Sequence, residues 1–524
     1  SPELFQLVAT FGIVLIIQDA AQAIWGPEDL VGPRAPGLDS IVRIFGEPIP
    51  EYDLALIVIG PLVLLAVWLI LNRTRWGTLV LAATHDREMA AALGINQRLL
   101  FTSVFFLGSF LAGLGGALQL PRETVSLLMD LNVIAEAFVV VVIGGMGSVP
   151  GAFLAAVIIG ELNAFGILVF PQITIVLAFL VMAVVLVLRP HGLFGTPEVH
   201  SVDAAHVREE PLEPFGPRQR IAVTVGLAAL GLMPLLVEDF TLVLATDILV
   251  FALFAASLQF LMGTGGMVSF GHAAYFGLGA YGAALVVKHF GAGMVLGLVA
   301  APVAAGVGAL VFGWFCVRLS GVYLAMLTLA AAQIVWATAF QWQPVTGGDD
   351  GILGIWPMPA LSGKVAYYYT ALIVCSLAIL ALRRIVYAPF GYVLRGGRDA
   401  PVRIEAIGID LQRHQWFGFI VAGVFAGIAG GIYVYSKGSV FPDELAIPRS
   451  VNGLIMVLFG GIQTIAGPIV GALSFTVLED QLSRLDYWRA LLGAVILFVV
   501  LLAPQGIAGG LKDLARRFAG ERPS

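Results

Sequence analysis

The sequence predicts an all-α polytopic membrane protein made of two pseudo-symmetric helical bundles related by an axis along the membrane normal. Three observations predict it: the composition, the long charge-poor runs and an internal repeat. Of 524 residues, 59% are hydrophobic and only 12% are charged, against roughly 45–50% and roughly 25% in soluble domains. Runs such as 173–189 are apolar almost throughout, which favours helices, because a barrel strand would alternate in polarity.

The distribution of charge gives the membrane orientation. Basic residues gather in 73–98, 189–220 and 383–413 and after 503, whereas acidic residues gather in 28–53, 349–350 and 443–444. Because basic loops stay on the cytoplasmic side, the sequence predicts a multi-pass membrane protein in contact with membrane lipid, with its basic loops in the cytoplasm. The predicted helices are 4–22, 54–71, 99–119, 133–147, 151–170, 172–188, 221–237, 242–262, 267–287, 293–316, 321–341, 368–385, 413–433, 450–463, 466–481 and 488–503.

The second half of the chain repeats the first. Residues 76–98 (WGTLVLAATHDREMAAALGINQR) align with 390–413 (FGYVLRGGRDAPVRIEAIGIDLQR), so that Gly94 meets Gly408 at a spacing of 314 (408 − 94). Farther on, 143–152 meets 459–468 at a spacing of 316 (459 − 143). Because the matched segments and the basic loops follow the same order in both halves, the halves share one membrane orientation. This predicts that they are related by an axis along the membrane normal, with a central pathway between them.

The repeat also defines the expected domains. We divide the chain into a first half (1–189), a proline-rich cytoplasmic linker (190–220), a second half (221–512) and a cytoplasmic tail (513–524). Nothing in the first half corresponds to 221–318. We therefore expect the first half to be N-terminally incomplete.

Each half carries a short helix-forming stretch in a basic loop, at 86–96 and at 401–410. Gly94 and Gly408 are suited to end these helices, since glycine readily takes the left-handed conformation at a helix C-terminus. An interfacial helix resting on lipid headgroups is the simpler alternative. The duplication favours paired docking sites for a two-fold symmetric cytoplasmic partner.

The motifs resemble a known family. AATHDREMAAALGIN and GGMGSVPGA are similar to the first subunit of the branched-chain amino-acid permease family, and SFGHAAYFGLGAYGAAL, RIEAIGID and SVNGLIMVLFGGIQTIAGPIVGAL are similar to its second. The resemblance covers nearly the whole chain and implies a fusion of two permease subunits, with the N-terminal helices of the first missing. It also implies a binding-protein-dependent ABC importer of the bacterial plasma (inner) membrane, with two ATP-binding subunits, an extracytoplasmic solute-binding protein and coupling helices that dock the ATPase. The docking residues are then Arg87, Glu88, Ala92, Gly94, Ile95, Arg403, Glu405, Ala406, Gly408 and Ile409.

Several classes of function are excluded or disfavoured. The basic residues are not massed on one surface, so the sequence does not indicate nucleic acid as a partner. The Gly-rich turns at 144–151 and 460–461 lack the Gly-Lys-Ser/Thr ending of a phosphate-binding loop. We therefore expect no enzyme activity, no metal and no cofactor of the chain's own, with ATP bound by partner subunits.

Polar residues inside predicted spans are candidate pathway residues, because burying them in lipid is costly. The candidates are Glu136, Glu161, His272, Gln259 and Asn452. Interhelical hydrogen bonding is an equally good explanation of them. Asp19, Asp247, Glu479 and Asp480 lie near predicted helix ends, where we expect headgroups and water to solvate them.

The sequence leaves three hypotheses about function. The first is an ATP-driven importer of branched-chain or related amino acids; importers of urea, amides or aromatic acids resemble it. The second is a secondary transporter or channel that uses Glu136, Glu161 or His272 for protons or ions. The third, a membrane anchor or scaffold, does not explain the two matched loops.

Overall fold

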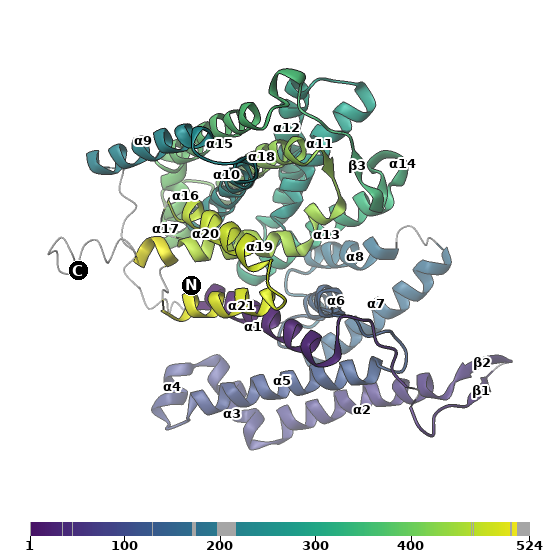
Figure 1. The fold of residues 1–524 in the computed structure, drawn as a ribbon. Coiled ribbons are helices and arrows are strands. Elements are labelled where there is room, and N and C mark those ends of the chain that lie inside the picture. Colours follow the sequence, from purple (N-terminus) through teal and green to yellow (C-terminus); the bar gives the residue numbers. More distant parts are fainter. Residues whose placement is uncertain are drawn as a thin grey trace. The chain divides into compact units, whose positions relative to one another are not determined.

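The computed structural model describes residues 2–33, 35–44, 46–127, 129–169, 174–195, 216–462, 464, 466–502 and 506–510. Within these residues nine helices are long and apolar enough to cross a membrane, and the only strands are two short two-stranded pairs, β1–β2 and β3–β4 (Figure 1). The prediction of an all-α polytopic membrane protein is confirmed. The chain divides into two compact units, a smaller unit (21–161 and 191–197) and a larger unit (1–20, 162–190 and 198–524).

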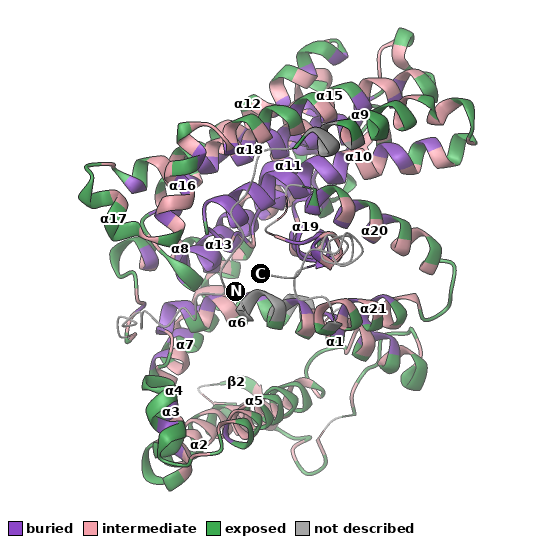
Figure 2. Cartoon of the chain, turned by 90° about the vertical axis from the view of Figure 1, so that its left-hand side faces the viewer, coloured by how far each residue is buried: buried purple, intermediate pink, exposed green. Residues whose placement is uncertain are grey.

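The smaller unit is dominated by long lipid-suited helices. Its elements are β1 (Ile41–Ile44), β2 (Glu47–Pro50), α2 (Glu51–Arg73), α3 (Arg75–His85), α4 (Arg87–Ala92), α5 (Gln97–Gln119), α6 (Met129–Gly144) and most of α7 (Val149–Val169). Tyr52 at the start of α2 donates to the Leu118 carbonyl at 2.8 Å, and Asp53 pairs with Arg122 at 3.1 Å. These contacts tie the start of α2 to the end of α5. Helix α2 has no buried residue, and green, exposed ribbon covers much of α2 and α5 in Figure 2.

The larger unit contains the densest core. Besides α1 (Pro2–Trp25) and α8 (Thr174–Leu188), its elements are α9 (Pro217–Leu232), α10 (Asp239–Gln259), α11 (Ala273–Phe290), α12 (Met294–Cys316), α13 (Gly321–Gln341), α14 (Gln343–Thr346), β3 (Ile352–Leu353), α15 (Lys364–Val386), α16 (Pro389–Asp399), α17 (Pro401–Ala406), α18 (Leu411–Lys437), β4 (Ser439–Val440), α19 (Ile447–Gly460), α20 (Gly467–Leu482) and α21 (Trp488–Leu502). Helices α11, α12 and α18 pack mutually, and buried residues concentrate on α10, α11, α13 and α18 (Figure 2).

Small residues bring α11, α12 and α18 together. A methyl group on Gly279 of α11 would lie 2.8 Å from the Gly427 carbonyl carbon of α18. A methyl group on Gly427 would in turn lie 2.9 Å from the Ala301 carbonyl oxygen of α12. Because lipid tails are as apolar as leucine, helices in membranes associate through such close contacts rather than through a hydrophobic drive.

The predicted helix at 267–287 is wrong at its start. Helix α10 runs into a π-helical turn at Phe260–Thr264, and α11 begins only at Ala273. The intervening segment is held by side-chain hydroxyls of distant helices: the Phe270 N–H donates to Thr328 at 3.1 Å and the Ala273 N–H to Ser450 at 3.0 Å. Since these hydroxyls accept from backbone N–H groups that a longer helix would have paired internally, the break is stabilised by tertiary contacts.

The last helix of each sequence half packs on a helix of the other half. Helix α8 packs against α13. On α21, Gly493 faces Gly12 of α1, where an added methyl group would come within 3.0 Å of the Gly493 carbonyl oxygen. Asp19 of α1 also accepts the Ala490 N–H of α21 at 2.7 Å. Each half of the repeat therefore contributes its last helix to the packing of the other half.

The domain boundaries remain predictions, because the compact units group the helices by packing rather than by repeat. Most of the predicted linker (190–220) and all of the predicted tail (513–524) lie outside the described residues. The symmetry axis and the incomplete first half remain predictions as well.

Equivalent helices of the two halves have different surroundings. Gly430 of α18 is buried, and a methyl group there would lie 2.9 Å from the Phe276 carbonyl carbon of α11. Its repeat equivalent on α5, 314 residues earlier, is Gly116 (430 − 314), and no described atom lies within 4 Å of a methyl group built there. The face of α18 that α11 covers is thus open on α5.

This difference predicts opposite effects of one substitution. Gly430→Ala should destabilise the protein by about 1–3 kcal/mol, because the core must move to admit the methyl group. Gly116→Ala should be neutral or stabilise by up to about 1 kcal/mol, because alanine is the better helix former. Thermal unfolding of the purified chain in detergent measures both. Equal shifts for the two variants would contradict the packing described here.

Candidate functional site

Two basic loops, residues 75–98 in the smaller unit and 389–412 in the larger unit, are the candidate functional sites and are called the paired loops below. In the first, α3 ends at His85, Asp86 is extended, α4 follows and Gly94 has φ +80°. The Asp86 side chain caps α4 by accepting the Met89 N–H at 2.8 Å. A small apolar cluster of Ala83, Ala90 and Leu100 closes the loop on itself.

The second loop repeats this geometry at a constant spacing of 314. Helix α16 ends at Asp399, Ala400 interrupts the helix with φ −152° and ψ 73°, α17 follows and Gly408 has φ +86°. Pro401 stands at the first position of α17, where its fixed φ suits a helix start. The predicted ends of the two short helices at Gly94 and Gly408 are confirmed, although α4 and α17 are each only 6 residues long.

Matching hydrogen bonds extend the correspondence past the glycines. The Ile95 N–H donates to the Ala90 carbonyl at 3.1 Å, and the equivalent Ile409 N–H donates to Ile404 at 3.3 Å. Asn96 then caps α5 through the Leu99 N–H at 3.2 Å, and Asp410 caps α18 through the Arg413 N–H at 3.0 Å. Because Asp86, Asn96 and Asp410 cap α4, α5 and α18, these turns have a defined shape.

The predicted docking residues form the outer surface of these loops. Eight of them are exposed and two, Ile95 and Ile409, are half-buried; the exposed ones are Arg87, Glu88, Ala92, Gly94, Arg403, Glu405, Ala406 and Gly408. Sequence reasoning missed the most exposed apolar pair. Leu93 is 74% exposed and its equivalent Ile407 is 71% exposed. Exposed aliphatic side chains at equivalent positions, next to charged residues, are typical of a protein–protein interface.

The candidate pathway residues are divided between the two units. Glu136 on α6 and Glu161 on α7 are exposed in the smaller unit, whereas Asn452 on α19 is half-buried in the larger unit. His272 is fully buried, and its Nε2 lies 2.8 Å from the Ser257 hydroxyl of α10. Gln259 is buried too, and its amide donates to the Ile462 carbonyl at 2.8 Å.

Two carboxylates differ from expectation. Asp19 is only 3% exposed and caps the start of α21, and Asp247 pairs with Lys437 of α18 at 2.8 Å. The prediction that headgroups and water solvate them is wrong. Other groups of this chain compensate these charges instead, a backbone N–H for Asp19 and the ammonium of Lys437 for Asp247. This is the usual arrangement for ionisable groups within membrane helices.

The apolar helices and the paired loops define a multi-pass membrane protein built on an internal repeat. A family model described as branched-chain amino acid transport system / permease component matches residues 4–188 and 240–500. The match covers most of the chain, so the chain belongs to this family. Two separate matched segments fit two permease subunits in one chain.

Curated relatives agree with this assignment. The chain is 24% identical over 319 residues to the high-affinity branched-chain amino acid transport system permease protein LivM of Escherichia coli, covering 55% of this chain and 75% of LivM. It is 31% identical over 208 residues to the permease protein BraD of Pseudomonas aeruginosa (38% and 66% covered) and 26% identical over 207 residues to LivH of Escherichia coli (38% and 67%). No solved structure matches.

The contact between His272 and Ser257 predicts energetic coupling within the core. His272→Ala and Ser257→Ala should each destabilise the protein, and the double variant should lose less than their sum by about 0.5–2 kcal/mol, because the first change already removes the bond. Unfolding of the four proteins in mixed micelles measures this term. Strictly additive losses would show that the two side chains do not interact.

Proposed function

We propose that this chain combines the two membrane subunits of an ATP-driven importer of branched-chain amino acids in the bacterial plasma membrane. The observation that carries the proposal is the shared geometry of the paired loops, each with the same short helix, the same positive-φ glycine and the same exposed aliphatic residue. Family membership supports a permease rather than an enzyme. ATP is bound by partner subunits, and the chain needs no cofactor of its own.

Two equivalent loops suit two ATP-binding subunits. Leu93 and Ile407 supply apolar contacts, and the flanking pairs Arg87–Glu88 and Arg403–Glu405 supply charged rims. An interface with an apolar centre and a polar rim combines affinity with specificity. The capped starts of α5 and α18, at Gln97 and Leu411 near the ends of the loops, would transmit motion of the motor into these helices.

The secondary-transporter alternative has less support. A proton or ion pathway needs ionisable groups that follow one another through the membrane. His272 instead lies against the Ser257 hydroxyl inside the core, and Gln259 is engaged with the Ile462 carbonyl. These bonds favour a packing role for both side chains and leave transport energy to an external motor.

The substrate class rests on the relatives. LivM, LivH and BraD are named as permeases of high-affinity branched-chain amino acid transport systems. We extend that substrate to this chain, with an extracytoplasmic solute-binding protein as the partner that delivers it. Urea, amides and aromatic acids are the substrates to be tested against it.

Docking through the exposed aliphatic pair gives the first test. Leu93→Asp with Ile407→Asp should lower ATP-driven uptake at least about tenfold, because a carboxylate at the centre of an interface must be desolvated without a partner. Uptake into vesicles that contain the chain and its ATP-binding subunits measures it.

The matched control exchanges the two residues, Leu93→Ile with Ile407→Leu, and keeps the apolar surface. It should retain near-normal uptake. Full uptake by the aspartate variant, or uptake by the chain alone without ATP-binding subunits, would reject the ATP-driven mechanism.

The substrate proposal is tested in the reconstituted system. Leucine, isoleucine or valine, added with the solute-binding protein, should raise ATP hydrolysis several-fold above the basal rate, because the loaded binding protein favours one state of the permease. Urea, an aliphatic amide and an aromatic acid should leave the rate near basal. Stimulation by one of those three alone would replace the branched-chain assignment and leave the ATP-driven mechanism standing.

A further inference from the structure

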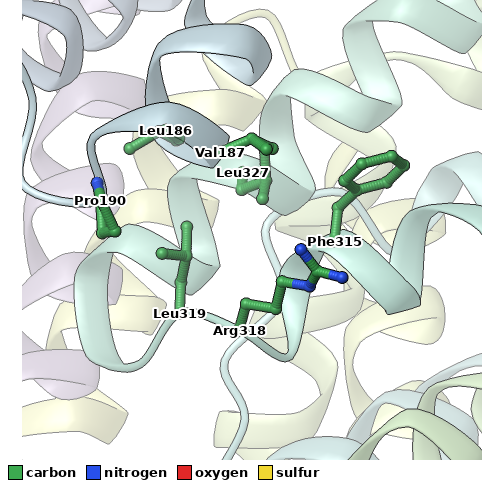
Figure 3. A pocket seen from close by; sticks show the side chains of 7 residues that line it. All are labelled: Leu186, Val187, Pro190, Phe315, Arg318, Leu319 and Leu327. Carbon is green, nitrogen blue, oxygen red and sulfur yellow. The ribbon is translucent and has the colours of Figure 1, made fainter.

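A hydrophobic groove lies among α8, α12 and α13 of the larger unit. It consists of two adjoining cavities of about 330 Å³ and about 140 Å³, which share Val187, Phe315 and Leu327. Figure 3 shows the smaller cavity, with Leu186 and Val187 on one wall and Phe315 and Leu327 near them. The groove thus joins the last helix of the first half to two helices of the second.

The larger cavity is lined entirely by apolar or weakly polar side chains. They are Leu180, Ala183, Val184, Val187, Leu188, Phe312, Phe315, Cys316, Leu327, Ala331 and Ile334. Several of them are open to the surroundings, including Val184 at 47% and Leu188 at 75% exposed. Because α12 and α13 are long and apolar enough to span the membrane, this groove faces hydrocarbon rather than water.

Arg318 gives the groove a charged end. Its side chain borders the smaller cavity together with Pro190 and Leu319 (Figure 3). The guanidinium lies 3.7 Å from the centre of the Trp314 ring, a contact that holds it in place. Among the ion pairs of the described residues, none involves Arg318, so its charge is available to a ligand.

This charged end is cytoplasmic. Pro190 directly follows α8 and Arg189, in a basic segment that the positive-inside rule assigns to the cytoplasm. Basic pockets between membrane helices on this side of a membrane bind anionic lipid headgroups. A hydrocarbon-lined groove with one cation at its cytoplasmic end therefore has the charge and polarity of a phospholipid.

We propose that the groove binds an anionic phospholipid of the cytoplasmic leaflet, with an acyl chain along α8 and α13 and the phosphate on Arg318. The lipid contacts helices from both halves of the repeat. It therefore adds a membrane component to the seam between the halves, and this inference goes beyond the proposed transport function and does not depend on the substrate.

The first test compares two arginines. Arg318→Gln should lower retention of phosphatidylglycerol about fivefold, since one basic side chain contributes about that factor to binding of an anionic lipid. Arg384→Gln, which removes an equally exposed arginine at the end of α15, should not. Native mass spectrometry of the full chain, purified from vesicles of phosphatidylglycerol and phosphatidylethanolamine, measures retained lipid.

The second test fills the groove. Val184→Trp should displace the lipid even with Arg318 intact, whereas Val295→Trp, at an exposed position of α12 outside the cavity lining, should not. Size-exclusion profiles check that both variants fold. Equal retention in Arg318→Gln and Arg384→Gln, equal retention of phosphatidylglycerol and phosphatidylethanolamine, or an unchanged lipid signal in Val184→Trp would overturn the proposal.

Discussion

Close approach of helices through small residues is the constraint on which this structure depends. In lipid, burying an apolar side chain against another helix gains little over burying it against hydrocarbon, so association relies on close packing and hydrogen bonds. Gly279 and Gly427 let the backbones of α11 and α18 nearly touch, and Gly12 does the same for α1 and α21. The long α18 then continues directly from the loop that carries α17. In the proposed importer, rigid packing of this kind would convert movement of a loop into movement of a whole helix.

Much of this arrangement could be predicted from the sequence, because the same pattern occurs twice and one copy can be compared with the other. One basic loop is ambiguous between a lipid-lying helix and a docking surface. Two loops with equivalent glycines are less ambiguous and favour a docking surface. In the structure both loops have a glycine with positive φ, followed by a helix that Asn96 or Asp410 caps. Membrane spans were predictable for a simpler reason: apolar length alone identifies a helix where the backbone has no water to bond.

Features that depend on distant partners could not be predicted. The break before Ala273 requires the hydroxyls of Thr328 and Ser450, which are 58 and 177 residues from the N–H groups they bind. Asp19 near a predicted helix end suggested solvation, yet its partner is a backbone N–H on α21. Leu93 and Ile407 were overlooked because an aliphatic residue in an apolar chain gives no signal until its exposure is known.

The bond between Asp19 and Ala490 joins positions 471 residues apart. Because α1 precedes α21 in the chain, α1 is synthesised long before the helix whose N–H its carboxylate accepts. Until α21 has been synthesised, Asp19 lacks this partner, so the pairing of α1 with α21 follows the synthesis of all the helices between them. A polypeptide that stops before α21 therefore leaves the carboxylate of α1 without the N–H that it accepts in this structure.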